Sequence, residues 1–235
     1  FVDEIPGINA IIYLCQLGTE GGHAFADVLS GKVTPSGKLT DTFAASFDDY
    51  PSSCNFNESE DYVCYTEDIF VGYRYFETFK KDSVLYPFGF GLGYGKFKRI
   101  FISGEVKENA VNIKVSTENI ASYNSKDVIE IYVEAPQGVL GKPSRCLCGF
   151  KKTKKLAKNE KAEFEFEIPF YSFSSYDDSG VSGYKSCYIL EKGEYNFYLG
   201  GDVRSAEKVY SFTLDKNIVS ETLKEVSAPK KVFER

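Results

Sequence analysis

The first part of the chain has the hydrophobic pattern of an α/β layer. Asn9–Leu17 reads NAIIYLCQL, an apolar run without alternation, which is typical of a strand buried on both faces of a parallel sheet. Glu20–Ser30 follows with apolar residues at the period of a helix, and Gly31 stands where helices commonly end. The pattern predicts a strand, a tight turn and a helix, with a further short strand at Lys38–Phe43.

From Phe97 onward the pattern changes to short strands between turn residues. Ala162–Ile168 alternates apolar and acidic residues (AEFEFEI), so one face of this strand should be buried and the other solvated. Several such strands in succession predict an antiparallel β-sandwich of about seven strands. Besides Ala162–Ile168, we expect strands at Phe97–Ile102, Ala110–Asn119, Asp127–Ala135, Glu194–Leu199 and Lys208–Leu214.

The two patterns together predict the fold class α/β plus all-β. Residues 1–95 would form the end of an α/β sandwich domain, and residues 96–215 an antiparallel β-sandwich domain. The aromatic stretch Tyr65–Phe97 joins the two, and it carries Arg74 between two tyrosines. Residues 216–235 combine helical or linker spacing with a break at Ala228–Pro229, which predicts a linker toward a segment outside this sequence.

Composition narrows the classes of function. The 235 residues carry a net charge of −6 and one histidine, so there is no basic footprint for nucleic acid. No apolar run approaches the roughly 20 residues of a membrane-spanning helix. The chain begins with Phe1 and contains no methionine, which indicates a piece of a longer polypeptide. Its start has no features of a signal peptide, and a cytoplasmic location is slightly favoured over secretion.

The six cysteines do not predict a metal site. Cys146 and Cys148 share one face of an expected strand, but zinc sites usually combine two such pairs or add histidines. Reduced thiols are the expectation, and Cys54–Cys64 is the one pair whose loop setting allows a disulfide. The sequence has no phosphate loop, dinucleotide fingerprint or metalloprotease motif, so we expect neither metal nor cofactor.

Candidate sugar-binding residues lie where acidic and aromatic side chains meet. Glu67 and Tyr65 stand in the junction beside tyrosine-rich turns, a surface that suits sugars by stacking and hydrogen bonding. An equally good interpretation is structural: Glu67 caps a turn or forms an ion pair with Arg74. The long irregular stretch Phe47–Cys64 lies next to them, and loops of this length inside a domain are often functional.

Four stretches carry a family resemblance. Residues 17–43 (LGTEGGHAFADVLSGKVTPSGKLTDTF) resemble the end of the second domain of glycoside hydrolase family 3. Residues 65–77 (YTEDIFVGYRYFE) and 87–97 (PFGFGLGYGKF) resemble the family's next motifs, with Gly93 and Gly95 in place of Ser and Thr. Residues 142–156 (KPSRCLCGFKKTKKL) are similar to a stretch of its fibronectin type III-like domain, with Lys142 in place of Arg. The match covers nearly the whole chain in the family's order.

The resemblance implies a retaining exo-acting enzyme of the β-glucosidase type that cleaves β-linked glucosides or xylosides. In this family an Asp of a (β/α)₈ barrel is the nucleophile and a Glu of the α/β domain usually serves as acid/base. No position here matches either motif, so no catalytic residue is assigned to this chain. The expected role is scaffold, with the loop Phe47–Cys64 bordering the aglycone side. The segment 216–235 resembles family members in which the barrel domain follows the β-sandwich in the sequence.

The implied partners are a β-glucoside or oligosaccharide substrate and the barrel domain of the same protein. A homodimer is compatible with the sequence. Neither nucleic acid nor a membrane is expected as a partner. The alternative function is a non-catalytic interaction or adhesion module built on the β-sandwich.

Overall fold

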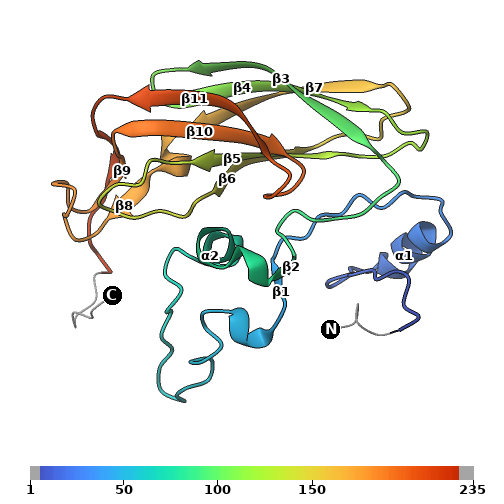
Figure 1. Ribbon diagram of the computed structural model, residues 1–235, viewed down its shortest axis with the longest axis horizontal. Helices are drawn as coiled ribbons and strands as arrows, with labels where there is room; N and C mark the ends of the chain where they lie inside the picture. Colours follow the sequence, from blue (N-terminus) through green and yellow to red (C-terminus); the bar gives the residue numbers. More distant parts are fainter. Residues whose placement is uncertain (1–5, 228–235) are drawn as a thin grey trace.

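A computed structural model describes residues 6–227 of the chain, and its larger part is a β-sandwich (Figure 1). One antiparallel sheet has the strand order β11-β10-β5-β6, and the facing sheet has the order β3-β4-β7. The seven strands match the predicted sandwich, and each expected strand from Phe97 to Leu214 is present. Their bounds are β3 (Phe97–Val106), β4 (Ala110–Asn119), β5 (Val128–Glu134), β6 (Cys146–Lys152), β7 (Lys161–Pro169), β10 (Gly193–Gly200) and β11 (Glu207–Leu214).

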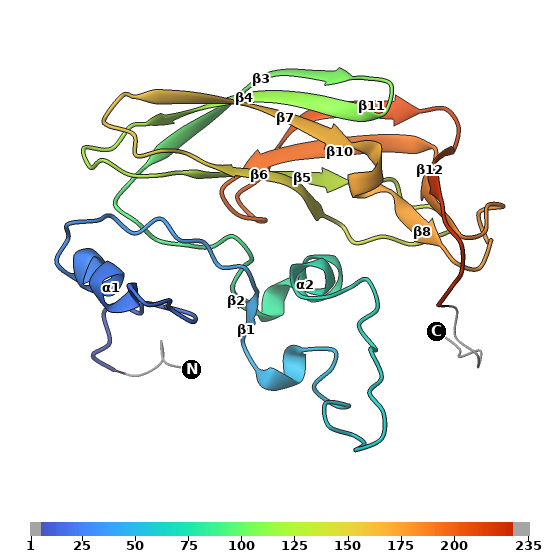
Figure 2. The same ribbon diagram turned by 180° about the vertical axis from the view of Figure 1, so that it is seen from behind.

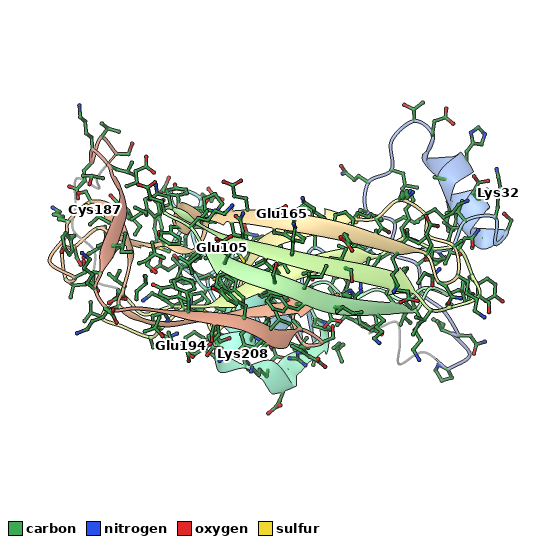
Figure 3. All side chains as sticks on the ribbon, turned by 90° about the horizontal axis from the view of Figure 1, so that it is seen from above. Lys32, Glu105, Glu165, Cys187, Glu194 and Lys208 are labelled. Atoms are coloured by element: carbon green, nitrogen blue, oxygen red, sulfur yellow. The ribbon has the colours of Figure 1, made fainter. Side chains whose placement is uncertain are left out.

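The core of the sandwich follows from the alternation of side chains along the strands. Ile113 on β4 and Ile131 on β5 are fully buried between the sheets, and Phe166 of β7 is nearly so. The outer face of the β3-β4-β7 sheet is solvated and carries Glu105 and Glu165 (Figure 3). β5 differs because its other face is buried as well, which brings polar side chains into the interior.

A smaller sheet extends one end of the sandwich (Figure 2). It has the order β12-β9-β8, with β8 at Ser175–Asp177, β9 at Cys187–Leu190 and β12 at Ile218–Thr222. The short 3₁₀-helix η4 (Phe170–Phe173) precedes β8. The segment 216–235, predicted as a linker, therefore contains a strand. Its pairing partner β9 lies far away in the sequence, so local spacing did not indicate it; residues 228–235 lie outside the described residues.

The part before β3 packs beneath the sandwich (Figures 1 and 2). It contains the helices α1 (Gly21–Leu29) and α2 (Tyr73–Phe79), the 3₁₀-helices η2 (Phe47–Asp49) and η3 (Lys81–Ser83), and a two-stranded sheet of β1 (Phe43–Ala44) and β2 (Val84–Tyr86). Helix α1 agrees with the predicted helix. Of the strand predicted at Lys38–Phe43, only Phe43 belongs to β1.

The prediction of a strand at Asn9–Leu17 was wrong for the part of the chain that the structure describes. The segment has no regular secondary structure, and Ile11 and Tyr13 are 52% and 64% exposed. A parallel strand needs neighbouring strands on its edges, and no strand pairs with this segment within residues 6–227. The apolar run is therefore left on the surface.

Helix α2 was not predicted, because its sequence YRYFETF is rich in aromatic residues that favour strands. Gly72 precedes it with φ of 58°, a conformation that glycine adopts without steric cost. Phe76 is fully buried and packs edge-on against Tyr50. Tertiary packing thus overrides the local preference of these residues.

Candidate functional site

The two residues predicted to bind sugar lie on a long surface loop between η2 and α2. Tyr65 is 90% exposed. Glu67 is partly buried in a tight turn, in which its carbonyl oxygen accepts the backbone N–H of Phe70 at 2.8 Å. Neither residue lines the two cavities between the Gly31–Lys38 segment and the sandwich. Sugar binding by Tyr65 and Glu67 therefore stays a prediction.

The base of this loop is firmly anchored. The Tyr50 hydroxyl donates to the Thr42 carbonyl oxygen at 2.9 Å and accepts the N–H of Ala44 at 3.1 Å. Asp49 forms an ion pair with Lys80 at 2.7 Å. These contacts join η2, the β1 segment and the end of α2, so the loop leaves the body of the protein in a defined direction.

The tip of the loop is aromatic and open to solvent. Phe56, Tyr62 and Val63 are 71%, 58% and 71% exposed. The Asn55 side-chain amide donates to the carbonyl oxygen of Cys64 at 3.0 Å and closes the tip on itself. Cys54 and Cys64 are free thiols, as are the other four cysteines. The loop therefore offers exposed ring faces on a base held in place.

Helix α2 fixes the first part of the chain to the sandwich. The Tyr73 hydroxyl accepts the N–H of Leu147 on β6 at 2.8 Å, and its ring packs against Phe88 and Tyr132. Glu77 is buried and paired with Arg204 at 2.8 Å. This contact surface, here called the seam, combines an aromatic cluster with a buried ion pair.

Arg74 does not pair with Glu67 within the described residues. Its guanidinium interacts with the Tyr73 hydroxyl and lies near Cys146. Burial lowers the pKa of Arg74, but the interactions with Cys146 and Tyr73 outweigh this effect and raise it. The sequence offered two structural roles for Glu67, a turn or an ion pair with Arg74. The described residues contain the turn but not the ion pair.

Polar groups on the covered face of β5 lie behind the seam. The Tyr132 hydroxyl donates to Glu130 Oε2 at 2.5 Å, and both residues are buried. Burial raises the pKa of Glu130 and also that of Tyr132, whose proton is held further by the neighbouring carboxylate. Nothing in the sequence indicated that Glu130 and Tyr132 would form a buried pair. Their burial depends on α2, which covers a face of β5 that the alternation of residues alone would leave exposed.

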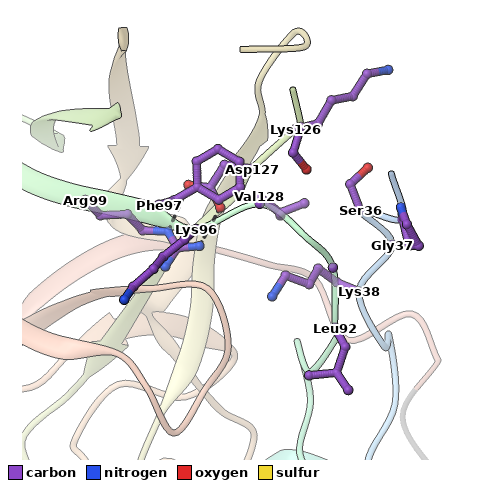
Figure 4. Close-up of a pocket in the computed structure, with 15 residues that line it drawn as sticks. Ser36, Gly37, Lys38, Leu92, Lys96, Phe97, Arg99, Lys126, Asp127 and Val128 are labelled. Atoms are coloured by element: carbon purple, nitrogen blue, oxygen red, sulfur yellow. Dashed lines mark hydrogen bonds and ion pairs between the residues drawn. The ribbon is translucent and has the colours of Figure 1, made fainter. Parts of the chain in front are cut away.

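A pocket of about 250 Å³ opens between the segment Pro35–Lys38 and the sandwich (Figure 4). On its sandwich side, Arg99 Nε donates to Asp127 Oδ2 at 3.0 Å, and Thr117 Oγ1 donates to the same oxygen at 2.8 Å. A Cβ atom at Gly91 would lie 2.3 Å from the Gly37 carbonyl oxygen, and one at Gly93 would lie 2.5 Å from that of Pro35. Glycine is thus required where the two walls of the pocket touch.

Two further findings concern the described residues 6–227. They contain no cluster of three or more His, Cys, Asp or Glu side chains that could hold a metal ion. They also contain no helix long and apolar enough to cross a membrane.

Comparison with known proteins gives the family. The sequence pattern of the glycosyl hydrolase family 3 C-terminal domain matches residues 2–94, and that of a fibronectin type III-like domain matches residues 127–203. The chain belongs to glycoside hydrolase family 3. The predicted class, α/β plus an all-β fibronectin type III-like sandwich, is confirmed by these two matches.

Relatives in the family match along the whole chain. A β-glucosidase of Ruminococcus albus is 47% identical over 100% of this chain and 24% of its own length. β-Glucosidase A of Butyrivibrio fibrisolvens is 42% identical over 96% of this chain and 30% of its own length. The crystal structure of a β-glucosidase from Paenibacillus barengoltzii superposes with a TM-score of 0.86 at 46% identity, covering 90% of this chain and 24% of that protein. The chain therefore spans less than a third of these relatives.

Proposed function

We propose that the protein containing this chain is a retaining, exo-acting glycoside hydrolase that releases β-linked glucose or xylose from the non-reducing end of its substrate. The observation that carries the proposal is the similarity to proteins named β-glucosidases along the entire chain. The nucleophile would be an Asp of a (β/α)₈ barrel in the same protein. Retention places the two catalytic carboxyl groups about 5–5.5 Å apart, so barrel and α/β domain must close on each other.

Within that enzyme this chain would supply scaffold and a wall of the active site. The division at residues 95 and 96 into an α/β part and a sandwich is part of the proposal. The exposed apolar residues of the segment 9–17 would pack against the remainder of the α/β layer, which would restore the strand pairing that the sequence predicts. The seam would then hold the sandwich at a fixed angle to the catalytic domains.

The stretch Phe47–Cys64 would border the aglycone side of the substrate, together with Tyr65 and Glu67, which follow it in the same loop. Its anchored base and exposed aromatic tip support this role, since aromatic rings offer apolar faces with little loss of side-chain entropy on binding. Tyr65 would stack on the sugar or aryl group next to the scissile bond, and Glu67 would accept a hydroxyl hydrogen bond. Such contacts would be equally strong in the ground state and the transition state, so their loss should affect binding more than turnover.

Hydrolysis is tested on the complete protein with an aryl-β-glucoside, and the chain of 235 residues alone should be inactive. Absence of turnover on β-glucosides and β-xylosides by the complete protein would refute the proposal and favour a non-catalytic interaction module. Turnover by the isolated chain would refute the placement of the catalytic groups outside it.

The wall is tested separately with Tyr65→Ala in the complete protein. We expect KM for a β-linked disaccharide to rise about five- to tenfold with kcat nearly unchanged, and Glu67→Gln to have a smaller effect in the same direction. The matched control is Tyr184→Ala, because Tyr184 is also an exposed tyrosine but lies in the loop between β8 and β9. Unchanged KM in both loop variants would remove the loop from the substrate site and leave the hydrolase proposal standing.

A further inference from the structure

Basic side chains gather around the pocket between Pro35–Lys38 and the sandwich, although the chain as a whole is acidic. Its lining includes four cations and one acidic residue: Lys38, Lys96, Arg99, Lys126 and Asp127. The carboxylate of Asp127 is already engaged by Arg99 and Thr117. The pocket is therefore a local region of positive charge in a protein of net charge −6.

Lys38 lies at the centre of this arrangement. Its side chain is half-buried and extends from the Ser36–Lys38 segment toward the side where Arg99 and Asp127 meet (Figure 4). Within residues 6–227 it forms no ion pair closer than 4 Å, although Glu130, Asp202 and Asp127 attract it from a distance. Burial, and after it the charge of Arg99, lowers the pKa of Lys38. A bound anion would stabilise the charged form of an ammonium group in these surroundings.

Lys152, a second lysine beside the pocket, is also surrounded by positive charge. Lys152 on β6 donates through its ammonium group to the Ser36 carbonyl oxygen at 2.8 Å, across the pocket wall. Burial lowers the pKa of Lys152, and so does the proximity of Lys126 and Lys38. Lys126 and Lys38 thus both repel the Lys152 ammonium group where two parts of the chain meet, and a bound anion would relieve this repulsion.

The neighbouring cavity extends the basic surface. It has a volume of about 400 Å³, shares Ser36, Ser125 and Lys126 with the first, and adds Lys155 and Lys32, of which Lys32 is paired with Asp27 at 2.9 Å. Its other lining residues include hydroxyl and amide side chains but no carboxylate. Hydroxyl and amide donors beside ammonium groups are the usual surroundings of bound phosphate oxygens.

We propose that the pocket is a binding site for a phosphate group, in which Lys38 and Lys126 hold the anion and link the Pro35–Lys38 segment to the sandwich. The first cavity is smaller than the roughly 300–1,000 Å³ of typical ligand pockets, so it suits a small oxyanion rather than a saccharide chain. The phosphate is either free or carried by a small ester such as a hexose phosphate, whose sugar would occupy the adjoining cavity. Lys126 points outward in Figure 4, and its flexible stem allows the ammonium group to turn inward.

Binding is tested by calorimetric titration of the complete protein with inorganic phosphate and, separately, with glucose 6-phosphate, against chloride at equal ionic strength. Phosphate should bind and raise the melting temperature, and chloride should do neither. Tighter binding of the ester that the Lys126→Met variant weakens would assign the site to a phosphorylated sugar, and equal binding would assign it to the free ion. Absence of binding by both would overturn the proposal.

Lysine variants distinguish phosphate binding in the pocket from nonspecific attraction to positive charge elsewhere on the protein. Lys38→Met and Lys126→Met should each weaken phosphate binding about tenfold, which corresponds to the loss of one charge-assisted contact. Lys107→Met is the matched control, because Lys107 is an exposed lysine that follows β3 at its far end. Lys126 is exposed, so its variant should fold even if the Lys38 variant does not. Phosphate binding that is equally strong in Lys126→Met and Lys107→Met would overturn the site. Activity on β-glucosides is not part of the readout, so the hydrolase proposal and this one fail independently.

Discussion

The buried ion pair between Lys142 and Glu191 should be the most sensitive polar contact of the sandwich. The two side chains are 5% and 7% exposed, and the Lys142 ammonium group bonds Glu191 Oε2. Glu191 Oε1 accepts the backbone N–H of Val139 at 2.9 Å. Gly138 makes this possible, since a Cβ atom there would lie 2.3 Å from Glu191 Oε1.

Replacing Lys142 with methionine keeps the unbranched chain except for its terminal ammonium group, and so removes the charge. Glu191 is then left buried without a cation, and breaking a buried pair in this way costs about 3–5 kcal/mol. The double variant Lys142→Met/Glu191→Gln removes both charges, and the glutamine carbonyl can still accept from Val139. We expect it to recover most of that loss, because a buried pair replaced as a whole is often close to neutral.

The free energy of unfolding is measured by urea denaturation, with the midpoint and slope fitted for each variant. Lys208→Met is the matched control: Lys208 pairs with Glu194 across β10 and β11 at 3.7 Å, and the side chains are 47% and 55% exposed (Figure 3). Its loss should cost less than about 1 kcal/mol. A Lys142 variant that loses no more than this control, or a double variant as unstable as the sum of its single changes, would refute the reasoning.

Two further predictions concern acid stability and the seam. Burial raises the pKa of Asp177, but hydrogen bonds from Ser182, Gly180 and Ser179 outweigh this effect and bring the pKa to about 2. This value lies below the ordinary aspartate pKa of about 3.9. The ionised carboxylate should therefore contribute roughly 2 kcal/mol of stability above pH 5, and this contribution should be lost as the pH falls toward 2. Asp177→Asn should remove this pH dependence in urea titrations, and a variant that keeps it would contradict the assignment. Tyr73→Phe should cost about 1–3 kcal/mol because the Leu147 N–H loses its acceptor, and a melting temperature equal to that of the parent would show that this bond contributes nothing.

The sandwich could be predicted because its strands carry their own signal. In β7 the alternation of phenylalanine and glutamate places Phe164 and Phe166 toward the core and Glu165 toward solvent. No knowledge of the partner strands is needed to assign such a face. The short β8 and the strand β12 lack this alternation, and only their pairing with β9 defines them.

The first part of the chain was harder to predict because its order depends on distant contacts. The apolar run at 9–17 reads as a buried strand but has no neighbouring strand in the described structure. Helix α2 forms from strand-favouring aromatics because Phe76 and Tyr73 are packed by Tyr50 and Phe88. Of the candidate sites, Tyr65 and Glu67 were visible in the sequence, whereas the basic pocket assembles from Lys38, Arg99 and Lys126, which no local pattern connects.

The glycines at 91 and 93 bear on how chains of this family can be recombined. Each presses against a backbone oxygen of the 35–37 segment with no room for even a methyl group, so the two stretches form a matched pair although more than fifty residues separate them. A hybrid made by joining two family members inside this interval would combine halves shaped for different counterparts. Crossover points placed before Pro35 or after Gly95 keep the pair together and should yield folded hybrids far more often.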